Sequence, residues 1–102
     1  MRMIVILTTV SKKQDAENLA KLLVEKRLAA CVNIIKIEKS IFQWKGKVTE
    51  AEEFLLLIKT AKPYEKLERF IRKNHPYKLP EIISFPIAKG YKKYLDWVAR
   101  PR

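Results

Sequence analysis

The order of its apolar segments constrains this chain most strongly. Runs dense in β-branched residues alternate with segments whose apolar positions recur every three or four residues. The first kind predicts strands, and the second predicts amphipathic helices. In chain order they predict a strand over 3–10, a helix over 12–27, a long strand pair over 30–60 that turns at Gly46, a helix over 63–75, a strand over 81–88 and a helix over 90–99.

This β-α-β-β-α-β order, followed by a short helix, predicts an α+β fold. Because crossovers between parallel strands are right-handed, we expect the ferredoxin-like arrangement, an antiparallel sheet with two helices on one face and a short C-terminal helix added. A chain of 102 residues can build one core but not two, so residues 1–102 are expected to form a single domain.

Local signals refine the boundaries of these elements. Ser11, with Gln14 three residues later, resembles a capping box at the start of the first helix. A break in the apolar alternation near 39–40 predicts a bulge or a bend in the long strand. The apolar run in "EFLLLIKT" predicts a central strand covered on both faces, and Pro86 predicts an edge position or a bulge for the last strand.

The chain has one cysteine, Cys31, and one histidine, His75. An intrachain disulfide and a zinc site of Cys and His from one chain are therefore excluded, and any metal needs oxygen ligands or several chains. We expect Cys31 to be a small core residue. A single cysteine, a short N-terminal apolar run and no run of membrane-helix length predict a cytoplasmic protein with no membrane partner.

The net charge of +11 is concentrated in the second half of the chain. Residues 1–58 hold ten Lys and Arg against seven Asp and Glu, whereas residues 59–102 hold twelve against four. A basic surface suits nucleic acid, but it also keeps a protein soluble. The strand that ends at Thr60 lacks the aromatic motif of RNA-recognition sheets, which argues against nucleic acid as a partner.

No common catalytic motif is present. Two glycines cannot build a phosphate-binding loop, and GxSxG, HExxH and CxxC do not occur. The sequence therefore predicts a protein that is not an enzyme.

Five segments resemble one known family. "EKRLAACVN", "FQWKGKV", "EFLLLIKT", "HPYKLPEI" and "GYKKYLDWV" follow one another as in the CutA family of small cytosolic divalent-cation tolerance proteins, over about Ile4 to Trp97. The resemblance implies a tight homotrimer, PII-like in architecture, that binds a small ligand or responds to metal ions. Physical reasoning agrees, since the strand pair 30–60 outruns its helices and a closed three-fold ring would cover Phe42 and Trp44.

The resemblance also implies a ligand-binding cleft between subunits, formed here by Trp44, Glu53, Lys59, His75, Tyr77 and Tyr94. Such a set suits an anion or another small ligand. Glu53 and Lys59 lie six residues apart on one strand, so they point the same way, roughly 20 Å apart, and can meet only across a bend or from different chains. A structural ion pair at the interface is the alternative for these two residues.

Copper binding in bacterial members uses a cysteine at the end of the first strand and two histidines before "PY". Here Thr8 or Thr9 replaces the cysteine and Asn74 replaces the first histidine, which leaves His75 as the one candidate ligand for Cu(II) or another divalent cation. The alternative role for His75 is at a helix C-terminus, where an imidazole can donate to free carbonyls and the helix dipole favours its protonation.

Three classes of function follow. The first is a non-enzymatic, trimeric ligand-binding or metal-response protein, and the missing motifs favour it. The second is an enzyme acting on a small anion, with His75 as acid and base and Lys59 as the anion anchor. The third is a basic nucleic-acid-binding module.

Overall fold

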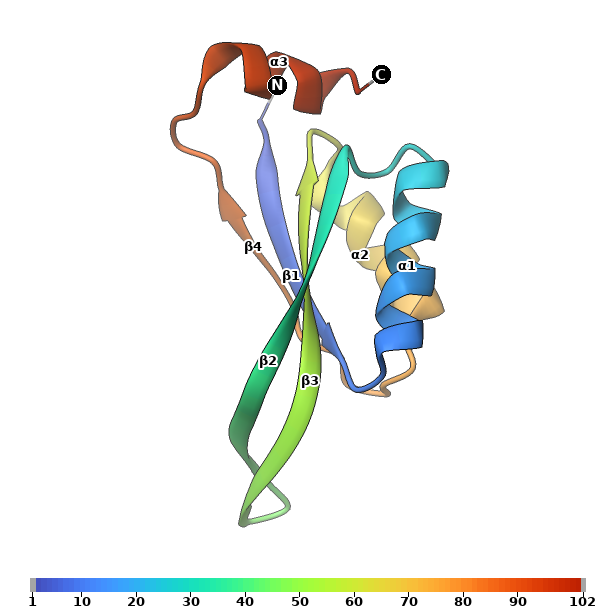
Figure 1. The fold of residues 1–102 in the computed structure, drawn as a ribbon, viewed down its shortest axis with the longest axis vertical. Helices are drawn as coiled ribbons and strands as arrows, with labels where there is room; N and C mark the ends of the chain where they lie inside the picture. The colour runs from blue at the N-terminus through green and yellow to red at the C-terminus, as the bar shows by residue number, and fades with distance from the viewer. Residues whose placement is uncertain (1, 102) are drawn as a thin grey trace.

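The computed structural model describes residues 2–101. Its elements, in chain order, are β1 (Ile4–Val10), α1 (Lys13–Glu25), β2 (Cys31–Trp44), β3 (Lys47–Thr60), α2 (Tyr64–Asn74), β4 (Ile82–Pro86) and α3 (Lys92–Ala99). The strands form one antiparallel sheet in the order β2-β3-β1-β4. Helices α1 and α2 lie on one side of the sheet, and α3 crosses its end (Figure 1). The predicted α+β fold, with its antiparallel sheet and added C-terminal helix, is confirmed.

The core lies between the sheet and its two long helices. Alternate residues of β1 and β3 point toward α1 and α2, which turn their own apolar stripes inward. Full burial of one such aliphatic side chain stabilises the fold by about 1.5–3 kcal/mol. The largest apolar side chains that are fully buried there are Ile6, Val10, Leu23, Leu56, Ile58, Leu67 and Ile71.

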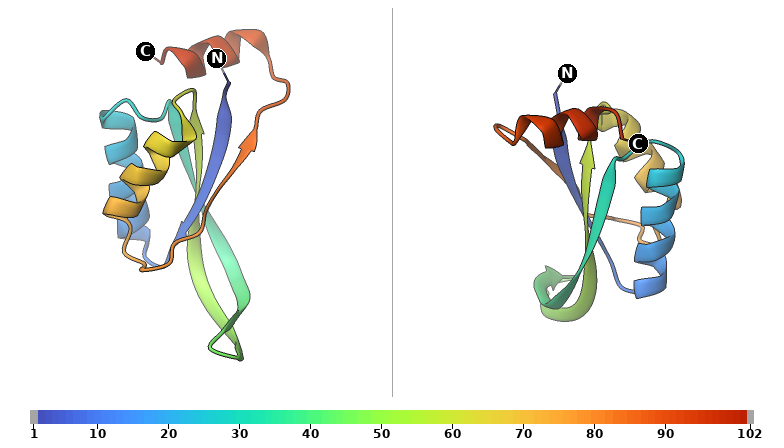
Figure 2. Two further views of the ribbon diagram at one scale, coloured as in Figure 1. Left: turned by 180° about the vertical axis from the view of Figure 1, so that it is seen from behind. Right: turned by 45° about the horizontal axis from the view of Figure 1, so that its top comes forward.

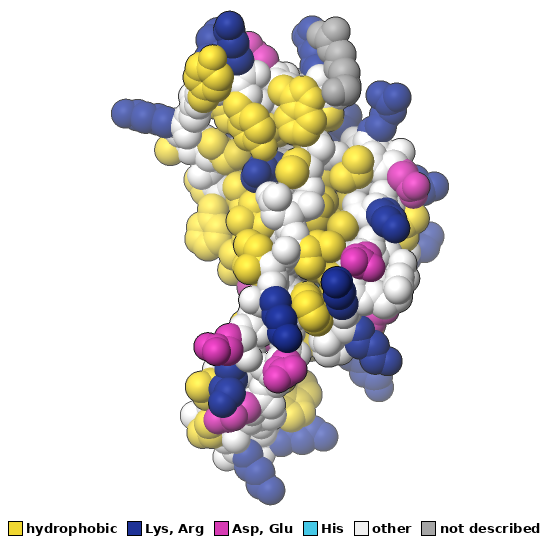
Figure 3. Space-filling model, in the orientation of Figure 1, with side chains coloured by type: hydrophobic (Ala, Val, Ile, Leu, Met, Phe, Trp, Pro, Cys, Tyr) yellow, Lys and Arg dark blue, Asp and Glu magenta, His cyan; other side chains and the backbone are white. Residues whose placement is uncertain are grey.

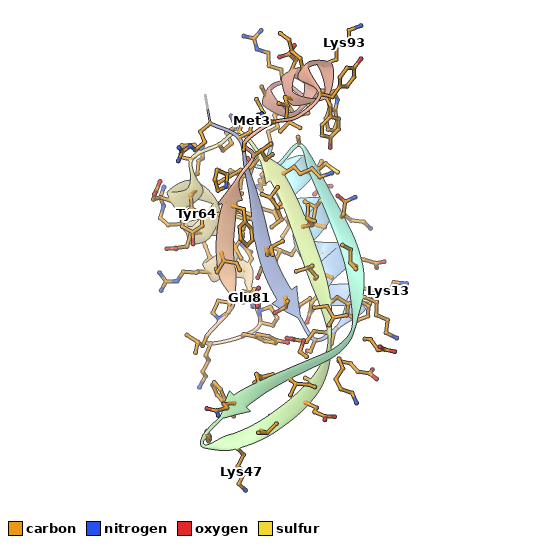
Figure 4. The ribbon with its side chains drawn as sticks, turned by 90° about the vertical axis from the view of Figure 1, so that its left-hand side faces the viewer. Met3, Lys13, Lys47, Tyr64, Glu81 and Lys93 are labelled. Atoms are coloured by element: carbon orange, nitrogen blue, oxygen red, sulfur yellow. The ribbon has the colours of Figure 1, made fainter. Side chains whose placement is uncertain are left out.

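The opposite face of the sheet carries no helix (Figure 4). We call it the helix-free face; over the body of the sheet its apolar residues include Val5, Leu7, Ile35, Ile37, Leu55, Leu57, Ile83 and Phe85. Ile35 and Ile83 are each 45% exposed and Phe85 is 52% exposed, and yellow side chains gather over the upper body of the molecule (Figure 3). Within one subunit, the prediction that β3 is covered on both faces is therefore wrong, because both long helices pack on the same side.

The β2–β3 hairpin extends well beyond the helices (Figure 2). Each of its strands has 14 residues, and the longest dimension of the molecule is 45 Å. Lys45 and Gly46 form the turn with φ of 51° and 77°, which is the left-handed pair that a tight hairpin requires. The predicted turn at Gly46 is confirmed.

Strand β4 pairs only with β1 among the described strands, so the edge position predicted from Pro86 is confirmed. The capping box is wrong: Lys12 is the N-cap of α1, and no side chain caps that helix. The helix ends at Glu25 rather than Arg27, because Arg27 takes a left-handed φ of 59°. Cys31 is half-buried rather than in the core. None of the helices within residues 2–101 combines the length and the apolar character needed to cross a membrane.

Two buried threonines differ in their hydrogen bonds. The Thr60 hydroxyl donates to the carbonyl oxygen of Leu28 at 2.6 Å and accepts the backbone N–H of Lys62 at 2.9 Å. The Thr8 hydroxyl is equally buried but has no hydrogen-bond partner among residues 2–101. These two residues therefore form a matched pair for measuring what a buried hydroxyl contributes.

We expect Thr60→Val to lower the free energy of unfolding by about 1–3 kcal/mol, because it leaves the buried carbonyl of Leu28 and the partly buried N–H of Lys62 unpaired. Thr8→Val should leave the free energy of unfolding unchanged or raise it, since no bond is lost and an unpaired hydroxyl is removed. Denaturant unfolding of both variants at one protein concentration measures the difference. Equal losses in the two variants would contradict the assignment.

Candidate functional site

A one-residue bulge in β2 decides which face of the hairpin carries its aromatic side chains. Between Ile37 and Ser40, β2 advances three residues while the paired strand β3 advances two. Because side chains alternate along a strand, the extra residue shifts the alternation of β2 by one. Phe42 and Trp44 therefore come to share a face with Glu53. The predicted bulge is confirmed, and it builds one wall of a cleft.

The segment after α2 folds back toward the end of β1 and is held there by His75. The Nδ1 atom of His75 accepts the backbone N–H of Tyr77 at 3.0 Å. Its Nε2 atom lies 2.9 Å from the carbonyl oxygen of Thr9, so Nε2 carries the proton and donates it. The His75 and Tyr77 rings meet edge to face, with centroids 5.0 Å apart. Both imidazole nitrogens are thus engaged.

The role expected for His75 at the end of α2 is wrong. The side chain of Asn74, not His75, donates to a carbonyl of the last turn, that of Phe70, at 2.8 Å. Burial lowers the pKa of His75, and its bond to the Thr9 carbonyl only partly opposes that effect. The helix ends at Asn74, and His75 is already extended with φ of -88° and ψ of 137°, so its ring turns toward β1 rather than toward the carbonyls of α2.

Tyr77, positioned by His75, reaches across to the hairpin. Its hydroxyl donates to the Glu53 carboxylate at 2.7 Å. Burial, followed by the bond to Glu53, raises the pKa of Tyr77 to about 12, while a hydrogen bond from Ser11 opposes the rise. Ser11, expected to cap α1, lies near the Tyr77 phenol instead. The Tyr77–Glu53 bond ties the loop after α2 to β3.

The hairpin and this loop enclose a cleft of about 870 Å³. Of the residues expected in the cleft, the structure places Trp44, Glu53 and Tyr77 in its lining; His75 lies outside it and holds Tyr77. Trp44 is 50% exposed there. Sequence reasoning missed the remaining residues of the lining, which are Thr9, Ser40, Ile41, Phe42, Thr49, Lys78, Leu79 and Glu81. The break in apolar alternation that marks the bulge could have indicated Ser40 and Phe42 as lining residues. No sequence pattern indicates the loop residues Lys78, Leu79 and Glu81.

Lys59 and Tyr94 form a separate pair at the other end of β3. The Lys59 ammonium donates to the Tyr94 hydroxyl at 3.1 Å and lies 5.4 Å from the centroid of its ring. This hydrogen bond raises the pKa of Lys59, and burial only partly opposes it. Tyr94 stands on α3, which crosses the sheet at the end opposite the hairpin tip (Figure 1).

Within one subunit, the six residues expected in one cleft are therefore divided between two places. The cleft itself holds two carboxylates, Glu53 and Glu81, and one ammonium, that of Lys78. With Lys59 absent, a single subunit offers a weakly acidic cleft with aromatic walls rather than an anion pocket. Residues 2–101 contain no group of three His, Cys, Asp or Glu side chains placed to hold a metal ion.

The raised pKa of Tyr77 generates a prediction about alkaline pH. The phenol ionises at pH near 10 in the unfolded chain and about 12 in the fold, so its contribution to stability is complete below pH 10 and is lost as pH rises through 12. We expect Glu53→Gln to lower this pKa without restoring its ordinary value, because burial is the larger cause.

Ultraviolet titration of phenolate formation checks the pKa. Tyr77→Phe identifies the signal, since the pKa of Tyr64 is also raised to about 12, by burial first and then by its bond to Glu68. A titration of Glu53→Gln that overlays that of the unchanged protein would contradict the assignment.

The chain matches the family model described as CutA1 divalent ion tolerance protein over residues 4–101. It is 48% identical, over 95 residues, to the divalent-cation tolerance protein CutA of Thermus thermophilus, and the match covers 92% of each chain. The solved structure of the Thermus protein has a TM-score of 0.89 at 47% identity and 95% coverage of both chains.

Eukaryotic relatives match as well. A CutA homologue from Danio rerio is 41% identical over 95 residues, which are 92% of this chain and 63% of that protein, so the chain spans less than two thirds of that relative. The crystal structure of CutA1 from Oryza sativa has a TM-score of 0.92 at 38% identity and covers 100% of this chain and 97% of that one. The sequence match and the shared fold agree, and the chain belongs to the CutA1 divalent ion tolerance family.

Proposed function

We propose that the protein acts without catalysis, as a cytoplasmic homotrimer that binds a small ligand or a divalent cation in the cleft under the hairpin. The cleft is the observation that carries this proposal, because it joins exposed aromatic walls to two carboxylates in about 870 Å³, a volume suited to a small molecule. The relatives are named for divalent-cation tolerance, and those names describe no reaction.

The helix-free face supports assembly. Its exposed aliphatic and aromatic side chains, with the open edge of β4 and the projecting hairpin, are features that soluble monomers seldom leave uncovered. Contact with neighbouring copies would bury them, and a closed ring leaves no free end for fibre growth. In such a ring the Lys59–Tyr94 end of one sheet would complete the cleft of another, which is how the divided site residues would meet.

The chemistry of the cleft favours a cation within one subunit. Trp44, Phe42 and Tyr77 offer ring faces, and Glu53 and Glu81 outnumber Lys78. Ring faces and carboxylates both attract cations, whether organic or metallic. A hard divalent cation would find oxygen ligands at the two carboxylates rather than at His75.

His75 is poorly suited to hold Cu(II) in this fold. A metal bond at Nδ1 would displace the Tyr77 N–H, and one at Nε2 would displace the bond to the Thr9 carbonyl. Thr8, at one position where bacterial members carry a cysteine, is fully buried under the helices. The enzyme alternative is also weakened in one subunit. Its anion anchor, Lys59, donates to Tyr94 of α3, whereas its proposed acid and base, His75, contacts Thr9 and has both ring nitrogens engaged.

Native mass spectrometry tests assembly and metal binding together. We expect a species with three times the 12.0 kDa mass of the chain. After one equivalent of Cu(II) per chain is added, we expect the same copper uptake in His75→Ala as in the unchanged protein, because the imidazole is already engaged at both nitrogens.

A monomer at micromolar concentration would contradict the trimer. Stoichiometric copper that is lost in His75→Ala would instead make His75 a metal ligand. Tyr77→Phe serves as the matched control, since it disturbs the same loop and leaves both imidazole nitrogens in place.

A further inference from the structure

A second hollow, of about 610 Å³, lies beside the cleft and has the opposite charge. We call it the basic hollow; its lining is Arg69, Arg72, Lys73, Tyr77, Lys78 and Pro80. Four of these six residues are cations and none is acidic. Tyr77 and Lys78 also line the cleft, so one loop separates a weakly acidic site from a strongly basic one.

The four cations have no carboxylate within 4.0 Å among the described residues. Within residues 2–101, the ion pairs shorter than 4.0 Å are Lys39–Glu50 and Lys92–Asp96, and neither includes a residue of the basic hollow. Glu68 of α2 accepts a hydrogen bond from Tyr64 instead. Like charges gathered around one concavity repel each other, so this arrangement favours the binding of an anion.

Stabilisation of the end of α2 explains only part of this cluster. The C-terminus of a helix carries roughly half a negative charge. Arg72 and Lys73, in the last turn of α2, interact favourably with it. The amide of Asn74 already donates to the Phe70 carbonyl there. Arg69 stands before the last turn and Lys78 lies beyond the helix, so the helix end does not account for either of them.

We propose that the basic hollow binds an oligophosphate chain. Guanidinium groups bind phosphate through paired N–H donors and ammonium groups bind it as point charges, and the hollow offers two of each. Phosphates of a nucleotide and free inorganic oligophosphate share this chemistry. Tyr77 and Pro80 form an uncharged wall of the hollow beside the cations, which suits a ligand with an organic portion as well.

The shape of the site favours a small oligophosphate over a nucleic-acid strand. The cations line one open hollow of about 610 Å³, a volume in the range of small-molecule pockets, instead of following a groove that tracks a backbone. The strand that would have to carry stacking aromatics, β3, shows acidic and aliphatic residues over 50–58 with Phe54 as its one aromatic.

Calorimetric titration of the intact protein with inorganic tripolyphosphate at low salt tests the proposal. We expect saturable binding that weakens about tenfold or more in Arg69→Gln/Arg72→Gln, because charge-assisted hydrogen bonds to two phosphates are lost. The control Lys13→Gln/Lys93→Gln removes the same charge from two exposed lysines outside the hollow (Figure 4) and should bind nearly as well as the unchanged protein. Circular dichroism verifies that both double variants are folded.

Three results would contradict the proposed site. They are the absence of saturable binding, an equal loss of affinity in the control, and an oligothymidylate that binds more tightly than tripolyphosphate and loses its affinity in the arginine variant.

A nucleoside triphosphate that binds as tightly as tripolyphosphate supports a site that recognises phosphate alone. One that binds more tightly supports a site that also uses the Tyr77 wall. Arg69→Lys/Arg72→Lys keeps the charge but loses the paired donors, so an intermediate affinity supports the assignment.

Discussion

Strand β3 is the element on which the rest of the structure depends. It pairs with β2 along nearly its whole length and with β1 over Phe54–Thr60. Its helix-facing residues close the core under α1 and α2, whereas its first half supports the projecting hairpin. Because one strand carries Glu53 and Lys59 on the same face, six residues apart, the two side chains cannot contact each other within a subunit. They could contact each other only across two subunits.

A short chain of hydrogen bonds connects the core to the cleft. Thr9, at the end of β1, accepts from His75, which accepts from the Tyr77 backbone; the Tyr77 phenol then donates to Glu53 on β3. The one histidine of the chain thus connects β1 to the loop after α2, because each of its two ring nitrogens makes a hydrogen bond. Two prolines, Pro76 and Pro80, follow it in the loop. The pKa shifts of His75 and Tyr77 both arise first from burial.

Part of the net charge of +11 is concentrated in the basic hollow, which four cationic side chains line. The cleft and the basic hollow are neighbours with opposite balances of charge, and Tyr77 and Lys78 line both. A ligand that moved this loop would change the lining of both the cleft and the basic hollow. The basic second half of the sequence is therefore partly organised into one concavity, rather than spread evenly over a solvated face.

The sequence by itself determined the elements, their order, the bulge, the turn at Gly46 and the family, because apolar periodicity, prolines and glycines act locally along the chain. Only the tertiary structure decided where the site residues stand. Ser11 does not cap α1, and His75 reaches β1 rather than the carbonyls of α2. Lys59 donates to Tyr94, whereas Glu53 accepts from Tyr77. Arg69 and Lys78 share a hollow although nine positions separate them. Contacts of this kind depend on how a strand and a loop cross in space, and no local pattern encodes that crossing.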